Sequence, residues 1–172
     1  MRLGDATWRE VADASGPERA VDGVKTPIVL IPVGSTEQHG PHLPLATDTW
    51  IAEELAGRAI HQTDGLMVGP TISVSASGEH AGFAGTLSIG LEVMTMVVVE
   101  LVRSADWAAG VVLVNGHGGN HRATCHDAEH HAQPHELVTV EVEEDDEKGN
   151  DGQQPDHGGS DGDECHRAYR AT

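Results

Sequence analysis

The 172-residue chain is long enough for one domain with a hydrophobic core, and its length favours one domain over two. Hydrophobic residues make up 38% of the sequence but aromatic residues only 3%, so the core must be built from Val, Leu, Ile and Ala. The formal net charge of −18 repels nucleic acids and anionic membrane surfaces. We therefore expect no nucleic-acid partner.

The sequence also predicts a soluble cytoplasmic protein with no membrane partner. Its start, MRLGDATWRE, has no apolar signal core, and the longest apolar stretch, VMTMVVVELV at 93–102, is too short and interrupted to span a bilayer. Cys125 and Cys165 form no CxxC pair, so a reducing compartment is expected. The acidity suggests a salt-loving (halophilic) source, because screening at high salt removes charge self-repulsion. The alternative explanation of the negative charge is a single acidic segment near the end of the chain.

Seven elements are predicted in chain order, the strands from segments rich in apolar residues and the helices from helical spacing. They are a strand at 27–34, a helix at 48–60, a strand at 66–74, a helix at 90–108, a strand at 110–116, a helix at 118–132 and a strand at 136–142. Strands that alternate with helices predict an α/β domain with a mainly parallel sheet.

Polar motifs follow the first and third predicted strands, where ligands gather in open parallel sheets. Glu37 and His39 follow the first strand, Asp48 opens the next helix, and His117 lies in NGHGGN after the third strand. Two carboxylates and two imidazoles form a mixed donor set that suits Zn²⁺ or Mn²⁺. A carboxylate can bridge two ions roughly 3.5–4 Å apart, and such a pair can hold a hydroxide for attack on a carbonyl. The hypothesis is amide hydrolysis.

Each of these motifs also has an alternative interpretation. With twelve histidines in the chain, a solvated or structural histidine is the alternative at each position. His126 and His130 lie one helical turn apart, but no HExxH glutamate stands between them, so a solvent-exposed face is expected. NGHGGN lacks the lysine and spacing of a P-loop, and the serine of GSTEQ has no His and Asp ordered as in a serine hydrolase.

Three ordered motifs, VGSTEQHGPHLPLATD, SGEHAGFAGTLSIG and VLVNGHGGNHRA, resemble the creatininase (creatinine amidohydrolase) family over roughly the first 122 residues. The resemblance implies a three-layer α/β/α sandwich, a binuclear metal centre and hydrolysis of C–N bonds in cyclic or linear amides. It also implies a homo-oligomer, frequently a homohexamer. The wording SGEHAGFAGT is similar to the family branch that trims a peptide precursor in mycofactocin maturation.

The resemblance assigns the metal ligands position by position. Glu37 and His39 match the family's first pair of ligands, one on each ion; Asp48 matches the bridging carboxylate and His117 the ligand of the NGH motif. The implied cofactors are two divalent ions, Zn²⁺ and/or Mn²⁺, with Fe²⁺ as a further option. Creatininase proper has a carboxylate two residues after that last histidine, where this chain has Gly119. Strict creatinine specificity is therefore not expected.

The resemblance weakens late in the chain. In place of a motif similar to HGGxxETS, DHGGSDGDE keeps His157, a candidate to protonate the leaving nitrogen, but has Gly162 at the expected position of the Glu. Glu164 comes two residues later and is a candidate replacement ligand. A solvated histidine is the alternative for His157. Glu79 and His80 of SGEHAGF are expected to shape the substrate pocket or a subunit contact, and Glu79 is a candidate catalytic residue. The polar rim of a turn is the alternative.

Two regions and two functions are expected from these patterns. Residues 1–142 are predicted to form the creatininase-like α/β domain, and 143–172 an acidic, Gly-rich, divergent segment that is loop or disordered. The first function is a metal-dependent amidohydrolase acting on a small amide or peptide. The alternative is a catalytically weak or inactive relative that acts as a binding or assembly subunit.

Overall fold

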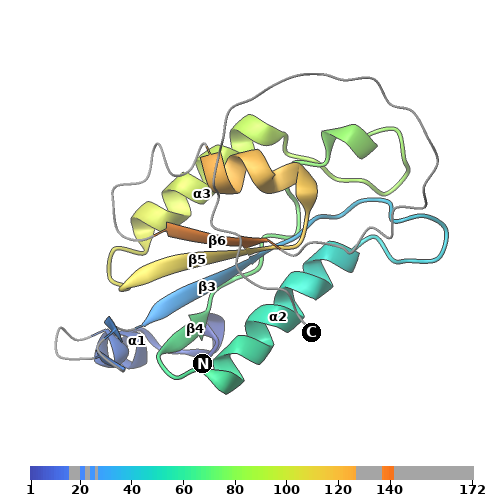
Figure 1. The fold of residues 1–172 in the computed structure, drawn as a ribbon. Coiled ribbons are helices and arrows are strands. Elements are labelled where there is room, and N and C mark those ends of the chain that lie inside the picture. Colours follow the sequence, from blue (N-terminus) through green and yellow to red (C-terminus); the bar gives the residue numbers. More distant parts are fainter. Residues whose placement is uncertain (16–19, 22–23, 26, 127–136, 142–172) are drawn as a thin grey trace, which may run out of the picture.

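A parallel sheet forms the centre of the computed structural model, which describes residues 1–15, 20–21, 24–25, 27–126 and 137–141 (Figure 1). Its strands lie in the order β4, β3, β5, β6, and every neighbouring pair is parallel. Their bounds are Leu66–Val68 for β4, Ile28–Val33 for β3, Gly110–Asn115 for β5 and Leu137–Glu141 for β6. The four predicted strands are confirmed.

The second predicted strand, 66–74, is shorter than expected. β4 ends at Val68, two residues before Pro70, which has no backbone N–H to donate to a sheet. The chain then touches the sheet once more, through an isolated parallel bridge between Ile72 and Val33. The apolar residues on both sides of Pro70 therefore overstated the length of this strand.

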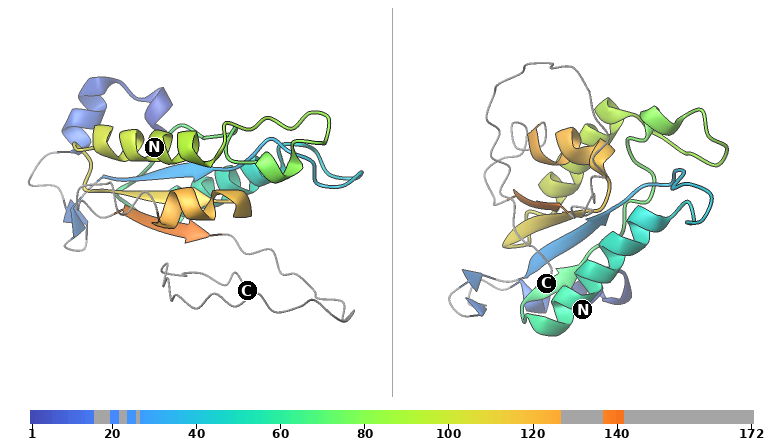
Figure 2. Two further views of the ribbon diagram at one scale, coloured as in Figure 1. Left: turned by 90° about the horizontal axis from the view of Figure 1, so that it is seen from above. Right: turned by 45° about the vertical axis from the view of Figure 1, so that its right-hand side comes forward.

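Helices cover both faces of the sheet, which gives the expected three-layer α/β/α arrangement (Figure 2). Helix α2 (Thr47–Gln62) packs on one face, and α3 (Leu91–Ser104) with the short π-helix η4 (Arg122–His126) lies on the other. The predicted helices at 48–60 and 90–108 are therefore confirmed, with α3 ending at Ser104. The predicted helix at 118–132 is instead a 3-10 turn, η3 (Gly118–Asn120), followed by η4; residues 127–132 lie outside the described residues.

Alternate residues of β3 face the two helical layers, as the period-2 geometry of a strand requires. Val29, Ile31 and Val33 are buried in one hydrophobic cluster with the inner side of α3. Leu30 belongs to a second cluster, which includes Ala56 of α2. Because the central strand is apolar on both faces, its burial fixes where the loop after it emerges.

Several short elements near the N-terminus were not predicted. They are η1 (Leu3–Asp5), α1 (Trp8–Ala14) and an antiparallel pair formed by β1 (Ala20–Val21) and β2 (Val24–Lys25). Helix α1 contains no buried residue, so burial in the core does not stabilise it. A capping box starts it instead: the Thr7 hydroxyl accepts from Glu10 N, and the Glu10 carboxylate accepts from Thr7 N at 2.7 Å.

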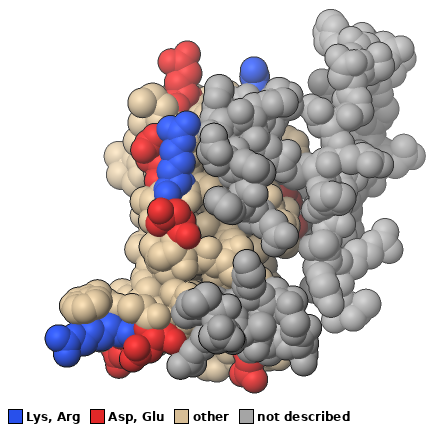
Figure 3. Space-filling view, turned by 90° about the vertical axis from the view of Figure 1, so that its left-hand side faces the viewer, with Lys and Arg blue, Asp and Glu red and all other residues tan. Residues whose placement is uncertain are grey.

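Charge and hydropathy of the described residues add two observations. No helix among them is long and apolar enough to cross a bilayer. Figure 3 shows the end of the molecule opposite the loops that follow β3 and β5, where acidic and basic side chains lie beside each other on the described part of the surface. Many of the chain's acidic residues belong to 143–172, outside the described residues.

Two methionines of α3 provide a matched test of this core. Met94 is 0% exposed in the hydrophobic cluster between α3 and the sheet, whereas Met96 is 67% exposed. We expect Met94→Ala to lower the free energy of unfolding by about 3 kcal/mol, through lost burial and the cavity left behind. Met96→Ala should change it by less than about 0.5 kcal/mol. Urea unfolding of both variants measures this, and equal losses would contradict the packing described.

Candidate metal centre

The candidate site lies at the carboxyl edge of the sheet, where β3 and β5 end side by side. Glu37 and His39 lie in the loop after β3, and His117 follows β5 by two residues. Asp48 lies in the first turn of α2 and is 4% exposed. Because β3 and β5 are neighbouring parallel strands, their ends bring segments about seventy residues apart into one place, as the sequence predicted.

Two glycines let α2 press against the ends of both strands. A Cβ at Gly34 would lie 2.4 Å from the Cα of Thr49, and one at Gly116 would lie 2.6 Å from the carbonyl oxygen of Asp48. The Thr49 hydroxyl donates to the Ser35 carbonyl at 2.8 Å, and the Ser35 hydroxyl donates to Asp48 Oδ2 at 2.7 Å. The first turn of α2, and with it the Asp48 carboxylate, is thereby locked to the sheet.

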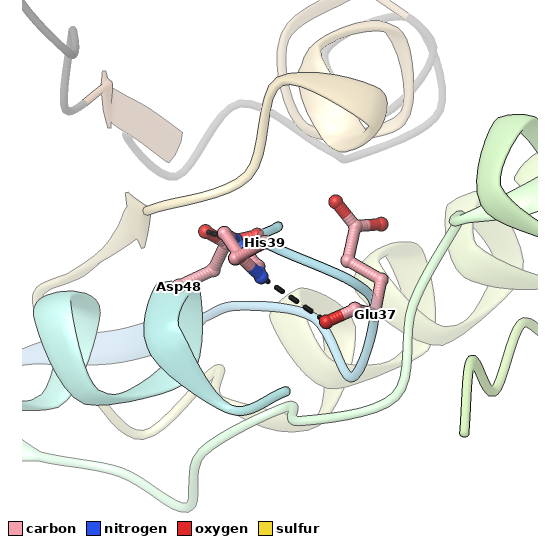
Figure 4. A group of neighbouring side chains, drawn as sticks. All are labelled: Glu37, His39 and Asp48. Atoms are coloured by element: carbon pink, nitrogen blue, oxygen red, sulfur yellow. Dashed lines mark hydrogen bonds and ion pairs between the residues drawn. The ribbon is translucent and has the colours of Figure 1, made fainter. Parts of the chain in front are cut away.

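The ring of His39 is oriented by a backbone carbonyl. Its Nδ1 lies 3.1 Å from the Glu37 carbonyl oxygen, and its Nε2 lies 2.6 Å from Asp48 Oδ1 (Figure 4). Because a carbonyl can only accept, Nδ1 carries a proton and donates it. In the neutral ring, the lone pair of Nε2 therefore points at the carboxylate.

The ring of His117 repeats this arrangement from the other strand. Its Nε2 donates to the Ala76 carbonyl at 3.0 Å, which leaves Nδ1 facing Asp48 Oδ2 at 3.1 Å and Glu37 Oε1 at 3.4 Å. The backbone of His117 is held by Asn115, whose side chain donates to the His117 carbonyl at 2.9 Å and accepts from its N–H at 3.3 Å. His117 is 6% exposed, so these contacts are shielded from water.

Asn120, the last residue of NGHGGN, ties together the loops around the site and was not predicted to do so. It is fully buried, donates to the Gly34 carbonyl at 3.2 Å and to Asn115 Oδ1 at 3.3 Å, and accepts from Ala76 N at 3.1 Å. The Ala76 carbonyl in turn accepts a hydrogen bond from the His117 ring. The asparagines of the motif signalled this role only through their position next to the predicted ligand.

Burial and hydrogen bonding act against each other on the three central groups. Burial lowers the pKa of His39 and of His117, but hydrogen bonds to Asp48 and to backbone carbonyls, with the nearby carboxylates, leave both pKa values above their ordinary value. Burial raises the pKa of Asp48, but hydrogen bonds from His117, Ser35 and His39 leave it below its ordinary value. The ionised Asp48 carboxylate and the protonated rings of His39 and His117 therefore stabilise each other.

A second group of side chains adjoins the first and shares Glu37. The possible ligand atoms of Glu37, His39 and Asp48 lie within 4.8 Å of one another, and so do those of Glu37, Glu79 and His80. Glu37 Oε1 is 3.6 Å from His80 Nε2, and Glu79 Oε1 is 3.5 Å from His117 Nε2. Glu79 and His80 are on the solvent side, with side chains 49% and 30% exposed.

The structure places the predicted site residues unequally. Glu37, His39, Asp48 and His117 come together, and Glu79 borders them. The remaining predicted residues, His157 and Glu164, lie outside the described residues, as does His130; the side chain of His126 is likewise not described.

The chain is similar to known proteins in both sequence and fold. The family model described as creatininase, creatinine amidohydrolase, matches residues 5–162. The chain belongs to the creatininase family. This confirms the family resemblance that the three sequence motifs carried.

Curated relatives of this family member carry different names. It is 53% identical over 100 residues to the mycofactocin precursor peptide peptidase of Mycolicibacterium smegmatis, which covers 55% of this chain and 40% of the relative. It is 29% identical over 125 residues to creatinine amidohydrolase of Pseudomonas putida, covering 69% of this chain and 45% of that protein. The chain thus spans less than half the length of these relatives.

Solved creatininase structures share the fold. One, described as the crystal structure of creatinine amidohydrolase, has a TM-score of 0.70 at 21% identity and covers 81% of this chain and 57% of that chain. Another, named Creatininase Mn, has a TM-score of 0.68 at 22% identity and covers 81% and 57%. These likenesses confirm the three-layer α/β/α fold.

The raised and lowered pKa values predict a two-sided pH profile for chelator-treated protein. The raised pKa values of His39 and His117 contribute stability that is complete below their unfolded values and is lost as pH rises through the folded values. The lowered pKa of Asp48 contributes stability that is lost as pH falls through its folded value. The free energy of unfolding should therefore be greatest between the two limbs.

Urea unfolding across pH, with chelator present, measures this profile. Asp48→Asn should flatten both limbs, because the histidines then lose their anionic partner. His61→Gln, at an exposed position in the last turn of α2, is the matched control and should leave the profile unchanged. An unaltered profile in Asp48→Asn would show that this cluster does not set the pH dependence.

Proposed function

We propose that this chain is a metal-dependent amidohydrolase whose ions are held by Glu37, His39, Asp48 and His117. One observation carries the proposal: both rings donate one N–H to a backbone carbonyl and aim the other nitrogen at Asp48. This is how metal-binding histidines are oriented in proteins, with the outer nitrogen fixing the tautomer of the inner one. A histidine that served only to pack the core would have no need of this convergence.

The residues present fit divalent cations. Carboxylate and imidazole donors accept Zn²⁺ or Mn²⁺, and Fe²⁺ is compatible with the same set. Glu37 is 4% exposed, and its Oε2 has no hydrogen-bond partner among the described residues. A buried carboxylate oxygen without a donor is costly unless a cation neutralises it. Following the sequence, we propose two ions, with Asp48 as the bridging carboxylate.

When bound, such ions polarise an amide carbonyl and lower the pKa of water so that hydroxide is available near neutral pH. The chain's own residues hold the groups that would bind the ions in fixed orientations. Ser35 and His117 contact one oxygen of the Asp48 carboxylate and His39 contacts the other, which holds the carboxylate in the site. His157 remains our candidate to protonate the leaving nitrogen, and Glu164 a candidate further ligand.

The substrate class proposed is a small amide or a peptide. The identity of 53% over 100 residues to a mycofactocin precursor peptide peptidase favours a peptide bond over a cyclic amide. Gly119, where creatininase proper has a carboxylate, argues in the same direction. A homohexamer, a cytoplasmic location and a halophilic source remain predictions from the sequence.

The alternative function is a binding or assembly subunit with weak or no turnover. Gly119 is the residue that favours it, because a family carboxylate near the second ion is then missing. This alternative keeps the fold and at least one ion but predicts no amide hydrolysis. Metal content and turnover together separate the two functions.

Elemental analysis of purified full-length protein, in high salt, tests the metal centre. We expect about two Zn²⁺ or Mn²⁺ per chain, with a loss of at least one in His39→Ala, which removes a ligand, and of both in Asp48→Ala, which removes the bridging carboxylate. His42→Ala and Asp64→Ala change exposed residues of the same types and should keep the full content. Wild-type protein without metal would contradict the proposal.

Turnover of amides and short peptides is then measured on the same proteins. The proposed enzyme should hydrolyse at least one of them, and His39→Ala and Asp48→Ala should lower kcat/KM by at least about 10³-fold, since they remove the source of the nucleophile. Two bound ions without turnover on any substrate would favour the binding or assembly subunit.

A further inference from the structure

We propose that Glu79 is a ligand of the second divalent cation and that Glu37 is shared between both cation positions. This inference rests on the proposed metal centre around Asp48 and assigns one further residue to it. The sequence had offered Glu79 only as a pocket or catalytic residue. Three features of the described structure lead to the new assignment.

The first feature is the unsatisfied oxygen of Glu37. Its Oε1 lies 3.4 Å from His117 Nδ1 and 3.6 Å from His80 Nε2, whereas Oε2 is buried and has no hydrogen-bond partner among the described residues. The ligand atoms of Glu37, Glu79 and His80 lie within 4.8 Å of one another. Two carboxylates that close repel each other unless a cation lies between them.

The second feature is the space above Gly119. A Cβ at this position would lie 2.5 Å from Glu79 Oε1, 2.5 Å from His117 Nε2 and 2.5 Å from the Ala76 carbonyl oxygen. The Glu79 carboxylate therefore occupies the place where a side chain of residue 119 would begin. Glycine at 119 is what allows Glu79 Oε1 to come within 3.5 Å of His117 Nε2.

The third feature is the orientation of His80. Gln38 Oε1 accepts from Gly40 N at 2.9 Å, so the amide nitrogen of Gln38 faces His80 Nδ1 at 3.1 Å and donates to it. The neutral His80 ring then carries its proton on Nε2, which faces Glu37 Oε1. His80, packed edge-on against Phe83, thus positions Glu37 and leaves Oε2 to the cation. Glu79 is the anionic partner on the solvent side.

Equilibrium dialysis of the full chain against Mn²⁺, with elemental analysis, tests the assignment without using turnover. Mn²⁺ is the probe because carboxylate oxygens suit it well. Glu79→Gln keeps the size of the side chain and removes its charge; Glu92→Gln makes the same change at an exposed position in the first turn of α3. Urea midpoints of both variants should match the wild type, because neither glutamate is buried.

Wild-type and Glu92→Gln proteins are expected to bind two Mn²⁺ per chain, and Glu79→Gln to bind one tightly and the other at least about 10- to 100-fold more weakly. Equal number and affinity in Glu79→Gln would overturn the assignment while leaving the ions around Asp48 in place. A wild type that binds a single ion would overturn the second position. A wild type that binds none would overturn this inference together with the proposed function.

Discussion

The arrangement of the site depends on one carboxylate, that of Asp48, and on the two imidazole rings that face it from different strands. Its position in the first turn of α2 is favourable for an anion, because the helix dipole is positive there. The Ser35 hydroxyl occupies one of its oxygens together with His117, and His39 contacts the other. A carboxylate held in this way cannot turn toward solvent, so its oxygens stay directed at the two imidazole rings.

The parallel sheet makes this convergence possible. β3 and β5 pair in register from Ile28 and Gly110 to Val33 and Asn115, so the loops after both strands leave the sheet at the same level. Gly34 and Gly116 follow those ends and provide the close approach that α2 needs. The apolar strands are thus more than a core, because their common end determines where the polar loops begin.

Much of this could be read from the sequence because its signals are local. The strands at 27–34 and 110–116 are continuous β-branched runs, and Glu37, His39 and His117 follow them within a few residues. β4 ends before Pro70, although the apolar residues on both sides of Pro70 suggested a longer strand. Helix α1 escaped because its capping box, and no apolar face, stabilises it.

The features that escaped are contacts between segments distant in sequence. The His117 ring donates to the carbonyl of Ala76, forty-one residues away, and Asn120 reaches back eighty-six residues to Gly34. Backbone carbonyls have no residue-type signature, so no motif could reveal which one orients a ring. The place of Glu79 over Gly119 is of the same kind, since it requires the loop at 76–80 to be known in three dimensions.

Under the proposed metal centre, the same contacts would link stability to metal binding. In the absence of a cation, protons on His39 and His117, together with the Ser35 hydroxyl, satisfy the oxygens of Asp48, and this is why hydrogen bonds to Asp48 raise both histidine pKa values despite burial. A divalent ion needs the nitrogens deprotonated, so it competes with those protons and releases them on binding. Apolar residues of similar volume would remove the buried charges and their desolvation cost. If the proposed metal centre binds a cation, the buried charges at the end of the central strands gain stability when that cation takes the place of the protons.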